Sequence, residues 1–178
     1  MSAALPAAGP LSALTSLSGR VALVVGGSGG IGAAIVELLL AAGATVVSAD
    51  LPGRAAPPGA EAASVDLADP AQVRALVEGV KQRHGRLHVL VHAAGITRDG
   101  MLWKLEDAAW DQVLAVNLDS AFHLLKAAAP LLRAGEGGAV VLIASINGQR
   151  GKLGQANYAA SKAGLIALGK TAAIELAA

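Results

Sequence analysis

Three polar residues in the C-terminal third of the sequence have the types and spacing of an acid–base unit. Tyr158 and Lys162 are four residues apart in a segment predicted to be helical, so their side chains project from one face of that helix. Ser145 precedes them, at the end of a predicted strand. A charged ammonium beside a phenol favours the phenolate, so we expect Lys162 to make Tyr158 a stronger acid. The pair alone is common on helix surfaces, and its interpretation depends on the rest of the sequence.

A glycine-rich segment, VGGSGGIG at residues 25–32, joins a predicted buried strand to a predicted helix. Glycines there allow a tight turn and let the backbone approach a pyrophosphate at the N-terminus of the helix. No single spacing can be assigned, because the segment matches GxGxxG, GxxxGxG and GxxGxxG. We predict a dinucleotide site formed by Gly26, Ser28, Gly29, Gly30, Ile31 and Gly32.

Asp50 ends the second predicted strand, at a position that controls which dinucleotide can bind. A carboxylate there accepts hydrogen bonds from the adenosine ribose and repels a 2′-phosphate. Two like charges about 4 Å apart repel by roughly 1–4 kcal/mol, although Arg54 lies close enough in sequence to weaken that effect. We therefore predict that NAD(H) is preferred over NADP(H). The alternative is that Asp50 only forms a turn before Pro52.

Short apolar segments alternate with helical ones from residue 20 onward. Repeated strand–helix–strand units require right-handed crossovers and produce a parallel sheet. The sequence therefore predicts an α/β fold, a doubly wound, Rossmann-like parallel sheet with helices on both faces. The expected strands are 20–25, 44–49, 62–66, 87–92 and 139–144. The expected helices are 31–42, 70–84 with Asp69 as N-cap, 107–133 with a bend near Pro130, and 157–178.

The composition of the chain excludes several classes of function. Its 178 residues include no cysteine, and its four histidines show no ligand-like grouping, so we predict no metal site. The net charge of +1 gives no reason to expect a nucleic-acid partner, and no apolar segment is long enough to span a membrane. Residues 1–18 lack the basic residues of a signal or transit peptide. We interpret them as a flexible tail on a cytoplasmic enzyme whose single domain covers residues 19–178.

With these residues placed, the sequence resembles the classical short-chain dehydrogenase/reductase family. Within that family it is most similar to the group of 3-oxoacyl-acyl-carrier-protein reductases and 3-hydroxyacyl-CoA dehydrogenases. The resemblance extends from about residue 19 to the C-terminus. It is strongest in AGITRD (94–99), VNL (116–118) and GQANYAASKAGLI (154–166).

The resemblance implies a role for each of four catalytic residues. Tyr158 would exchange a proton with the substrate oxygen, and Lys162 would hold the nicotinamide ribose. Ser145 would orient the substrate carbonyl. Asn117 would hold a helix irregularity and a water molecule of the proton relay. The further cofactor contacts implied by the family pattern involve Asp66, Leu67, Ala93, Ala94 and Gly95.

The sequence also departs from the family pattern. His92 and Ala93 replace a pair of asparagines, and Gly29 stands where NADPH-using relatives often carry arginine. Family members continue beyond the last helix with another strand, a substrate lid and a final strand, and residue 178 precedes all of these. We interpret the chain as C-terminally truncated, a fragment of a longer enzyme. The alternative is a product that lacks half of its substrate pocket.

The predicted reaction is hydride transfer between a nicotinamide cofactor and a secondary alcohol or ketone. The resemblance implies a 3-oxoacyl or 3-hydroxyacyl thioester as substrate, and other small carbonyl compounds stay open. The alternatives are a sugar-nucleotide epimerase or dehydratase, and a catalytically silent NAD-binding fragment. Small residues on the last helix favour a homodimer or homotetramer, although they could also pack within one chain. They are Ala159, Ala160, Ala163, Gly164 and Ala167.

Overall fold

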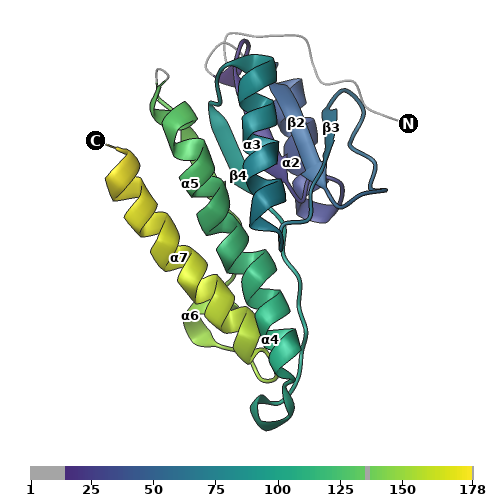
Figure 1. The fold of residues 1–178 in the computed structure, drawn as a ribbon, viewed down its shortest axis with the longest axis vertical. Helices are drawn as coiled ribbons and strands as arrows, with labels where there is room; N and C mark the ends of the chain where they lie inside the picture. The colour runs from purple at the N-terminus through teal and green to yellow at the C-terminus, as the bar shows by residue number, and fades with distance from the viewer. Residues whose placement is uncertain (1–14, 135–136, 178) are drawn as a thin grey trace.

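The computed structural model describes residues 15–134 and 137–177, in which five parallel strands form one sheet (Figure 1). The order β3-β2-β1-β4-β5 reverses direction at β1, because the chain first builds outward to β3 and then returns to β4 on the other side of β1. In such sheets ligands bind beyond the carboxyl ends of the strands at the reversal. The strands are β1 (Val21–Val25), β2 (Thr45–Asp50), β3 (Glu61–Ser64), β4 (Val89–His92) and β5 (Ala139–Leu142).

Helices cover both faces of this sheet, which confirms the predicted fold class. Helix α2 (Gly30–Ala41) packs on one face, and α3 (Pro70–His84), α5 (Ser120–Arg133) and α7 (Ala156–Leu176) lie side by side on the other (Figure 1). All residues of β1 are buried, and successive residues point to opposite faces. Leu23 accordingly belongs to the core beneath α3 and α5, and Val24 to the core beneath α2.

The predicted helix 107–133 is interrupted, which corrects the expected bend near Pro130. Helix α4 (Asp107–Leu114) passes into η2 (Ala115–Asp119), a π-helical turn, before α5 begins. Pro130 lies near the end of α5 without interrupting it. A proline removes only one backbone hydrogen bond from a helix. The π-turn changes the backbone pairing around Asn117, which is where the resemblance implied an irregularity.

The remaining elements match the sequence predictions less closely. The short helices η1 (Leu102–Lys104) and α6 (Asn147–Arg150) were not expected from the sequence. Asp69 is confirmed as the N-cap of α3, since its carboxylate accepts a hydrogen bond from Ala71 N at 2.8 Å. The predicted tail of residues 1–18 lies mostly outside the described residues, and its boundary stays a prediction. Its end is attached to the domain, because Leu17 N donates to Ala42 O at 2.7 Å.

Candidate active site

A cleft of about 450 Å³ lies beyond the carboxyl ends of the strands, next to the reversal of strand order. Because those strand ends meet at one edge, residues far apart in sequence converge there. Several predicted cofactor residues line this cleft, and Arg54, Ile96, Arg98, Gln112 and Val116 lie beside them. The predicted residues in the lining are Gly26, Gly29, Asp50, Asp66, Leu67, Ala93, Ala94 and Gly95.

The glycine-rich turn is packed too closely for larger residues at three positions, one of which is Gly27 against Ser48. Gly26 has φ +76°, and a Cβ added there would lie 2.5 Å from Ala94 N. A Cβ at Gly32 would collide with the backbone of Gly26, so the start of α2 packs directly on the turn. Gly29, the N-cap of α2, offers no side chain to the free N–H groups of the first helical turn. Exposed N–H groups beside a cleft fit the pyrophosphate of a dinucleotide.

Asp50 is held by the backbone at the edge of this cleft. Its Oδ2 accepts a hydrogen bond from Ser28 N at 3.1 Å, and its Oδ1 accepts one from Leu51 N at 2.8 Å. The carboxylate therefore connects the end of β2 to the glycine-rich turn. Arg54 and Arg98 line the same cleft, which places two arginines and two aspartates, Asp50 and Asp66, around it.

The other predicted residues of the glycine-rich turn support the cleft without lining it. Ser28 contributes its backbone N–H to Asp50, as described above. Gly30 has φ +51°, a conformation that favours glycine, and opens α2. The side chain of Ile31 is 60% exposed in the first turn of that helix.

Lys162 lies beside Gly95 of the cleft wall, and Tyr158 precedes it by one turn of α7. The ammonium of Lys162 is 5.8 Å from the centre of the Tyr158 ring, as expected for residues one helical turn apart. A Cβ added at Gly95 would lie 3.4 Å from Lys162 Nζ and 3.5 Å from Asn117 Oδ1. The predicted cofactor segment and the predicted catalytic helix therefore meet at Gly95.

Lys162 is almost fully buried, with 3% of its surface exposed. Burial lowers the pKa of Lys162 below its ordinary value, because the charged form loses hydration. The ammonium donates a hydrogen bond to Ile143 O, just after β5, at 2.7 Å. This bond ties the catalytic helix to the strand end that precedes Ser145. A backbone carbonyl leaves no sequence signal, so the contact could not have been predicted.

Ser145 is brought toward the same helix by a close contact that Gly148, three residues later, makes with α7. A Cβ added at Gly148 of α6 would lie 2.7 Å from Ala163 N and 2.7 Å from the carbonyl carbon of Lys162. Helix α6 therefore packs directly on the turn of α7 that carries Lys162. Ser145 Oγ accepts a hydrogen bond from Asn147 N at 3.2 Å, which anchors the serine beside this contact.

Asn117 is fully buried and joins three segments of the site. Its Oδ1 accepts a hydrogen bond from Ile96 N at 2.8 Å, and its Nδ2 donates to Ile96 O at 3.0 Å. The same Nδ2 donates to Ser161 Oγ at 3.1 Å, and Ser161 Oγ donates to Tyr158 O at 2.8 Å. Asn117 thus fixes the cleft wall at Ile96 relative to the helix that carries Tyr158. Ser161 lies in the recognised segment 154–166 but was not singled out from sequence.

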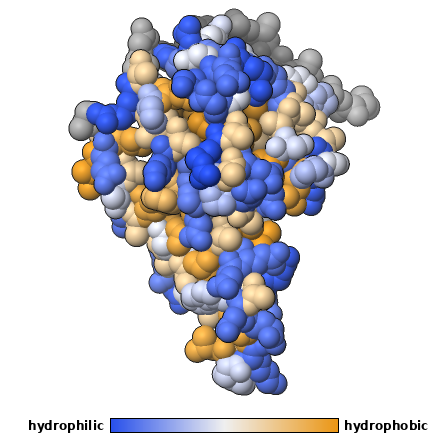
Figure 2. Space-filling model, viewed as in Figure 1, coloured by the Kyte–Doolittle hydropathy of each residue, from blue (hydrophilic) through white to orange (hydrophobic). Residues whose placement is uncertain are grey.

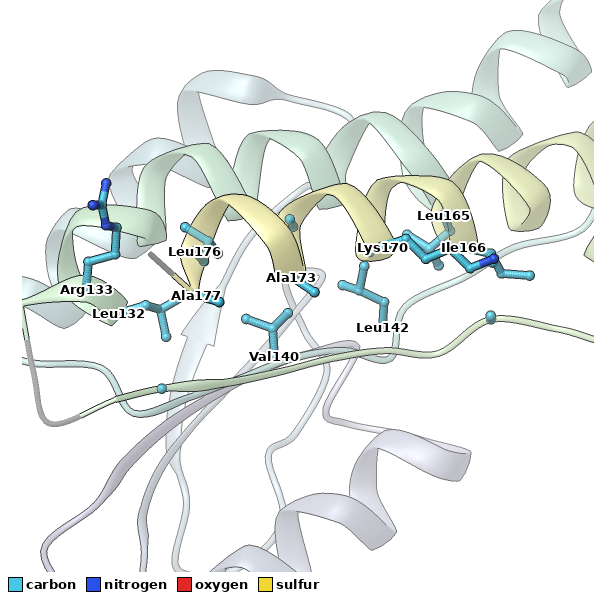
Figure 3. A pocket seen from close by; sticks show the side chains of 14 residues that line it. Leu132, Arg133, Val140, Leu142, Leu165, Ile166, Lys170, Ala173, Leu176 and Ala177 are labelled. Atoms are coloured by element: carbon cyan, nitrogen blue, oxygen red, sulfur yellow. The ribbon is translucent and has the colours of Figure 1, made fainter.

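A second cavity, of about 590 Å³, lies between β5 and the C-terminal half of α7 and includes none of the predicted site residues. Its lining is mainly apolar: Val140 and Leu142 of β5 point toward Leu176 and its neighbours on α7 (Figure 3). Figure 2 shows apolar side chains at the surface along the side where α7 lies, and Ile174 of that helix is 77% exposed.

The small residues of α7 divide between the two packing arrangements left open by the sequence. Gly164 packs within the chain, since a Cβ there would lie 2.7 Å from Leu118 Cδ2. Ala160, Ala163 and Ala167 are exposed.

Among residues 15–134 and 137–177 no group of His, Cys, Asp and Glu side chains could hold a metal ion. In the same ranges, no helix is both long enough and apolar enough to cross a membrane.

Comparison with known proteins identifies the family. The short chain dehydrogenase family matches residues 20–178. The chain is 38% identical over 173 residues to the 3-oxoacyl-[acyl-carrier-protein] reductase FabG of Escherichia coli, covering 91% of this chain and 69% of that protein. It is 38% identical over 176 residues to the enzyme of the same name from Thermotoga maritima, covering 90% and 70%.

A solved structure agrees with these sequence matches. A short chain dehydrogenase from Mycobacterium smegmatis superposes with a TM-score of 0.84 at 34% identity, covering 92% of this chain and 72% of that one. The family match, the relatives and the shared fold lead to one conclusion: the chain belongs to the short-chain dehydrogenase/reductase family of oxidoreductases.

Proposed function

We propose that this chain interconverts a secondary alcohol and a ketone with NAD(H), and that its substrate is a 3-oxoacyl or 3-hydroxyacyl thioester. The observation that carries the proposal is the meeting of the cleft and the Tyr158–Lys162 pair at Gly95. The names of the relatives, 3-oxoacyl-[acyl-carrier-protein] reductases, support the thioester as substrate class.

A bound nicotinamide supplies or takes up the hydride, and the residues of this chain handle the proton. During reduction the phenol of Tyr158 gives its proton to the carbonyl oxygen as a hydride reaches the carbonyl carbon. During oxidation the phenolate takes the hydroxyl proton as the hydride leaves the same carbon. A positioned acid–base group of this kind contributes about 10²–10⁴-fold to a rate.

The neighbouring residues support that proton transfer. Lys162, held by Ile143 O, places positive charge beside the phenol and favours the phenolate. Ser145 donates a hydrogen bond to the substrate oxygen and stabilises the charge that develops there. Asn117 holds the cleft wall at Ile96 in register with the catalytic helix. Burial of Lys162 places its charge in a medium of low dielectric constant, which strengthens the electrostatic effect.

Preference for NAD(H) over NADP(H) is the second part of the proposal. Asp50 lines the cleft in a fixed orientation and would repel a 2′-phosphate. Arg54 lines the same cleft and would attract it. We expect the carboxylate to dominate because it is anchored by two backbone N–H groups. The test compares the affinities of NADH and NADPH for the parent, Asp50→Ala and Arg54→Ala. Equal affinities of the parent for both cofactors would contradict the preference.

The catalytic assignment is tested by replacing the only tyrosine of the chain with phenylalanine. Oxidation of NADH by acetoacetyl-CoA is followed by absorbance for the parent and for Tyr158→Phe, with NADH affinity measured in parallel. We expect turnover to fall about 10²–10⁴-fold while NADH affinity stays within about threefold. Equal turnover of the two proteins would remove Tyr158 from the mechanism.

One rival function is favoured by a specific observation and is separated by the same experiment. The cofactor half of the chain is closely packed, whereas the cavity between β5 and α7 is open, as a catalytically silent NAD-binding fragment would require. NADH binding without turnover on several oxo-thioesters would support that rival.

We also propose a homodimer or homotetramer, with the exposed small residues of α7 at the contact. Light scattering measures the mass of the assembly.

A further inference from the structure

His92 is a fully buried histidine at the end of β4, directly before the cleft wall at Ala93–Gly95. Its Nε2 lies 2.7 Å from the hydroxyl oxygen of Ser120. That hydroxyl donates its single hydrogen to Val116 O, also at 2.7 Å. Ser120 can therefore only accept from the imidazole. The geometry assigns the proton of the neutral ring to Nε2 and makes His92 the donor.

Ser120 is bonded to the π-turn η2 through both its backbone and its side chain. Its backbone N–H donates to Ala115 O, five residues earlier, which is the pairing that defines a π-turn. This diverts the N–H that an α-helix would give to Val116 O. The Ser120 hydroxyl donates to Val116 O in its place. The side chain thus satisfies a backbone carbonyl inside the irregular turn.

The same π-turn carries Asn117, which clamps Ile96 and bonds to Ser161 on the catalytic helix. Hydrogen bonds therefore run from the strand to the turn through His92 and Ser120, and from the turn to the catalytic helix through Asn117. The first group of hydrogen bonds ends at Val116 and the second begins at Asn117, the next residue in the chain. An error in the position of the turn would move Asn117 relative to both Ile96 and the helix.

We propose that His92 is a positioning residue for the reaction, because its Nε2–H orients Ser120 and thereby holds the π-turn in the geometry that aligns Asn117. This role rests on the proposed function of the site, since Asn117 aligns Tyr158 only if Tyr158 performs the proton transfer. His92 itself touches neither substrate nor reacting atoms. It acts through Ser120 and the turn.

The surroundings of His92 favour the neutral form of its ring. Burial, followed by the positive charge of Lys162, lowers the pKa of His92 to about 4. Its Nδ1 is buried and has no hydrogen-bond partner among the described residues, so a proton there would have no acceptor. The asparagine expected from the family pattern has a shorter side chain. The imidazole instead extends from β4 to Ser120 on the adjoining helix.

The tautomer provides a test on the unaltered protein. Long-range ¹H–¹⁵N NMR spectra distinguish a protonated Nε2 from a protonated Nδ1. At neutral pH we expect His92 to be neutral with its proton on Nε2. A neutral ring with its proton on Nδ1 would overturn the proposal, because Nε2 could not then donate to Ser120. This measurement needs neither substrate nor cofactor, so it is independent of the proposed activity.

Hydrogen exchange tests whether the contact positions Asn117. We expect His92→Phe, which has no donor, to raise the exchange rate of the Ile96 N–H about tenfold relative to the amides of β1. His92→Gln can donate from Nε2 and should restore slow exchange to within about threefold. His88→Phe is the matched control, because His88 is a buried histidine near the opposite end of β4 that accepts from Val21 N at 2.9 Å.

The comparison between variants decides the outcome. The control should change the exchange of Ile96 no more than that of the β1 amides. An equal change at Ile96 and β1 in His92→Phe would show only lost stability and would overturn the positioning role. A failure of His92→Gln to restore Ile96 would overturn it as well. In an active parent, His92→Phe should also lower kcat about tenfold while leaving KM for the cofactor within about twofold.

Discussion

The half of the molecule around β1 and β2, which contains the predicted cofactor turn, is packed differently from the half formed by β5 and α7. Every residue of β1 is buried, and β2 is buried except at its ends. In β5, residues alternate between exposed and half-buried, and Val141 is 44% exposed. Helix α7 leaves a cavity of about 590 Å³ against that strand (Figure 3). The first half is closed by its own packing except along its edge strand β3, whereas the second is open between β5 and the C-terminal part of α7.

This difference indicates which part of the chain would bind the dinucleotide and which part would perform the proposed catalysis. Dinucleotide binding depends on backbone proximity within the first strands, so close packing and binding have the same requirement. The proposed catalysis depends on a few side-chain contacts between α7 and the rest of the chain, chiefly Lys162 with Ile143 and Asn117 with Ser161. Substitutions in the first half should therefore destabilise the fold, while those in the second should reduce activity at smaller cost in stability.

The largest effect is expected at Gly26. Gly26→Ala forces a side chain into φ +76° and against Ala94 N, and should lower the free energy of unfolding by about 3 kcal/mol or more. Gly29→Ala is the control, because nothing lies within 4 Å of a Cβ at Gly29. Its loss should be about 1 kcal/mol or less, because alanine is a poorer N-cap than glycine. Urea unfolding measures both. Equal losses for the two variants would show that the turn is not tightly packed.

The next effect depends on pH and involves His92, which lies where the two halves meet. Burial lowers the pKa of His92 from 6.5 to about 4, so the unfolded chain binds more protons than the folded chain between these values. The stabilisation is fully present above pH 6.5 and is lost as pH falls toward 4, by about 3 kcal/mol. His92→Phe should show a flatter pH dependence of unfolding in that window. Parallel curves for parent and variant would contradict this assignment.

Sequence reasoning found the elements whose signals are local. The alternation of apolar strands and helices predicted the sheet. The roles assigned to the glycine-rich turn and to the Tyr158–Lys162 pair stay predictions. The bond from Lys162 to Ile143 O was out of reach, because any residue can supply a backbone carbonyl. The contact between His92 and Ser120 joins residues 28 positions apart in sequence and belongs to no recognised motif. Contacts of this kind follow from tertiary packing alone.

A third prediction concerns the contact between α6 and α7 in the open half. Gly148→Ala would place a Cβ 2.7 Å from Ala163 N, and should lower the free energy of unfolding by about 1–2 kcal/mol. Because α6 would be displaced from the turn that carries Lys162, turnover should fall about tenfold. Gln149→Ala, at an exposed position of the same short helix, is the control and should change neither value. Unchanged turnover in Gly148→Ala would separate Ser145 from this contact.

The smallest effect on stability is expected where the effect on activity is large. Lys162→Met removes a buried charge, which stabilises the fold, and leaves Ile143 O without its donor, which destabilises it. Because these effects oppose each other, the free energy of unfolding should stay within about 1 kcal/mol of the parent.

The lowered pKa of Lys162 sets the sign of the pH dependence. The penalty for burying the ammonium is full below that lowered pKa and disappears as pH rises to the ordinary value of 10.5. Any gain of the variant over the parent should therefore be greatest below the lowered pKa of Lys162 and vanish in alkali. Turnover should nevertheless fall by about 10² or more, because the phenolate loses its cation. A large loss of stability in Lys162→Met would mean that the ammonium holds α7 in place, and the contrast between the two halves would then fail at a residue to which we assign a catalytic role.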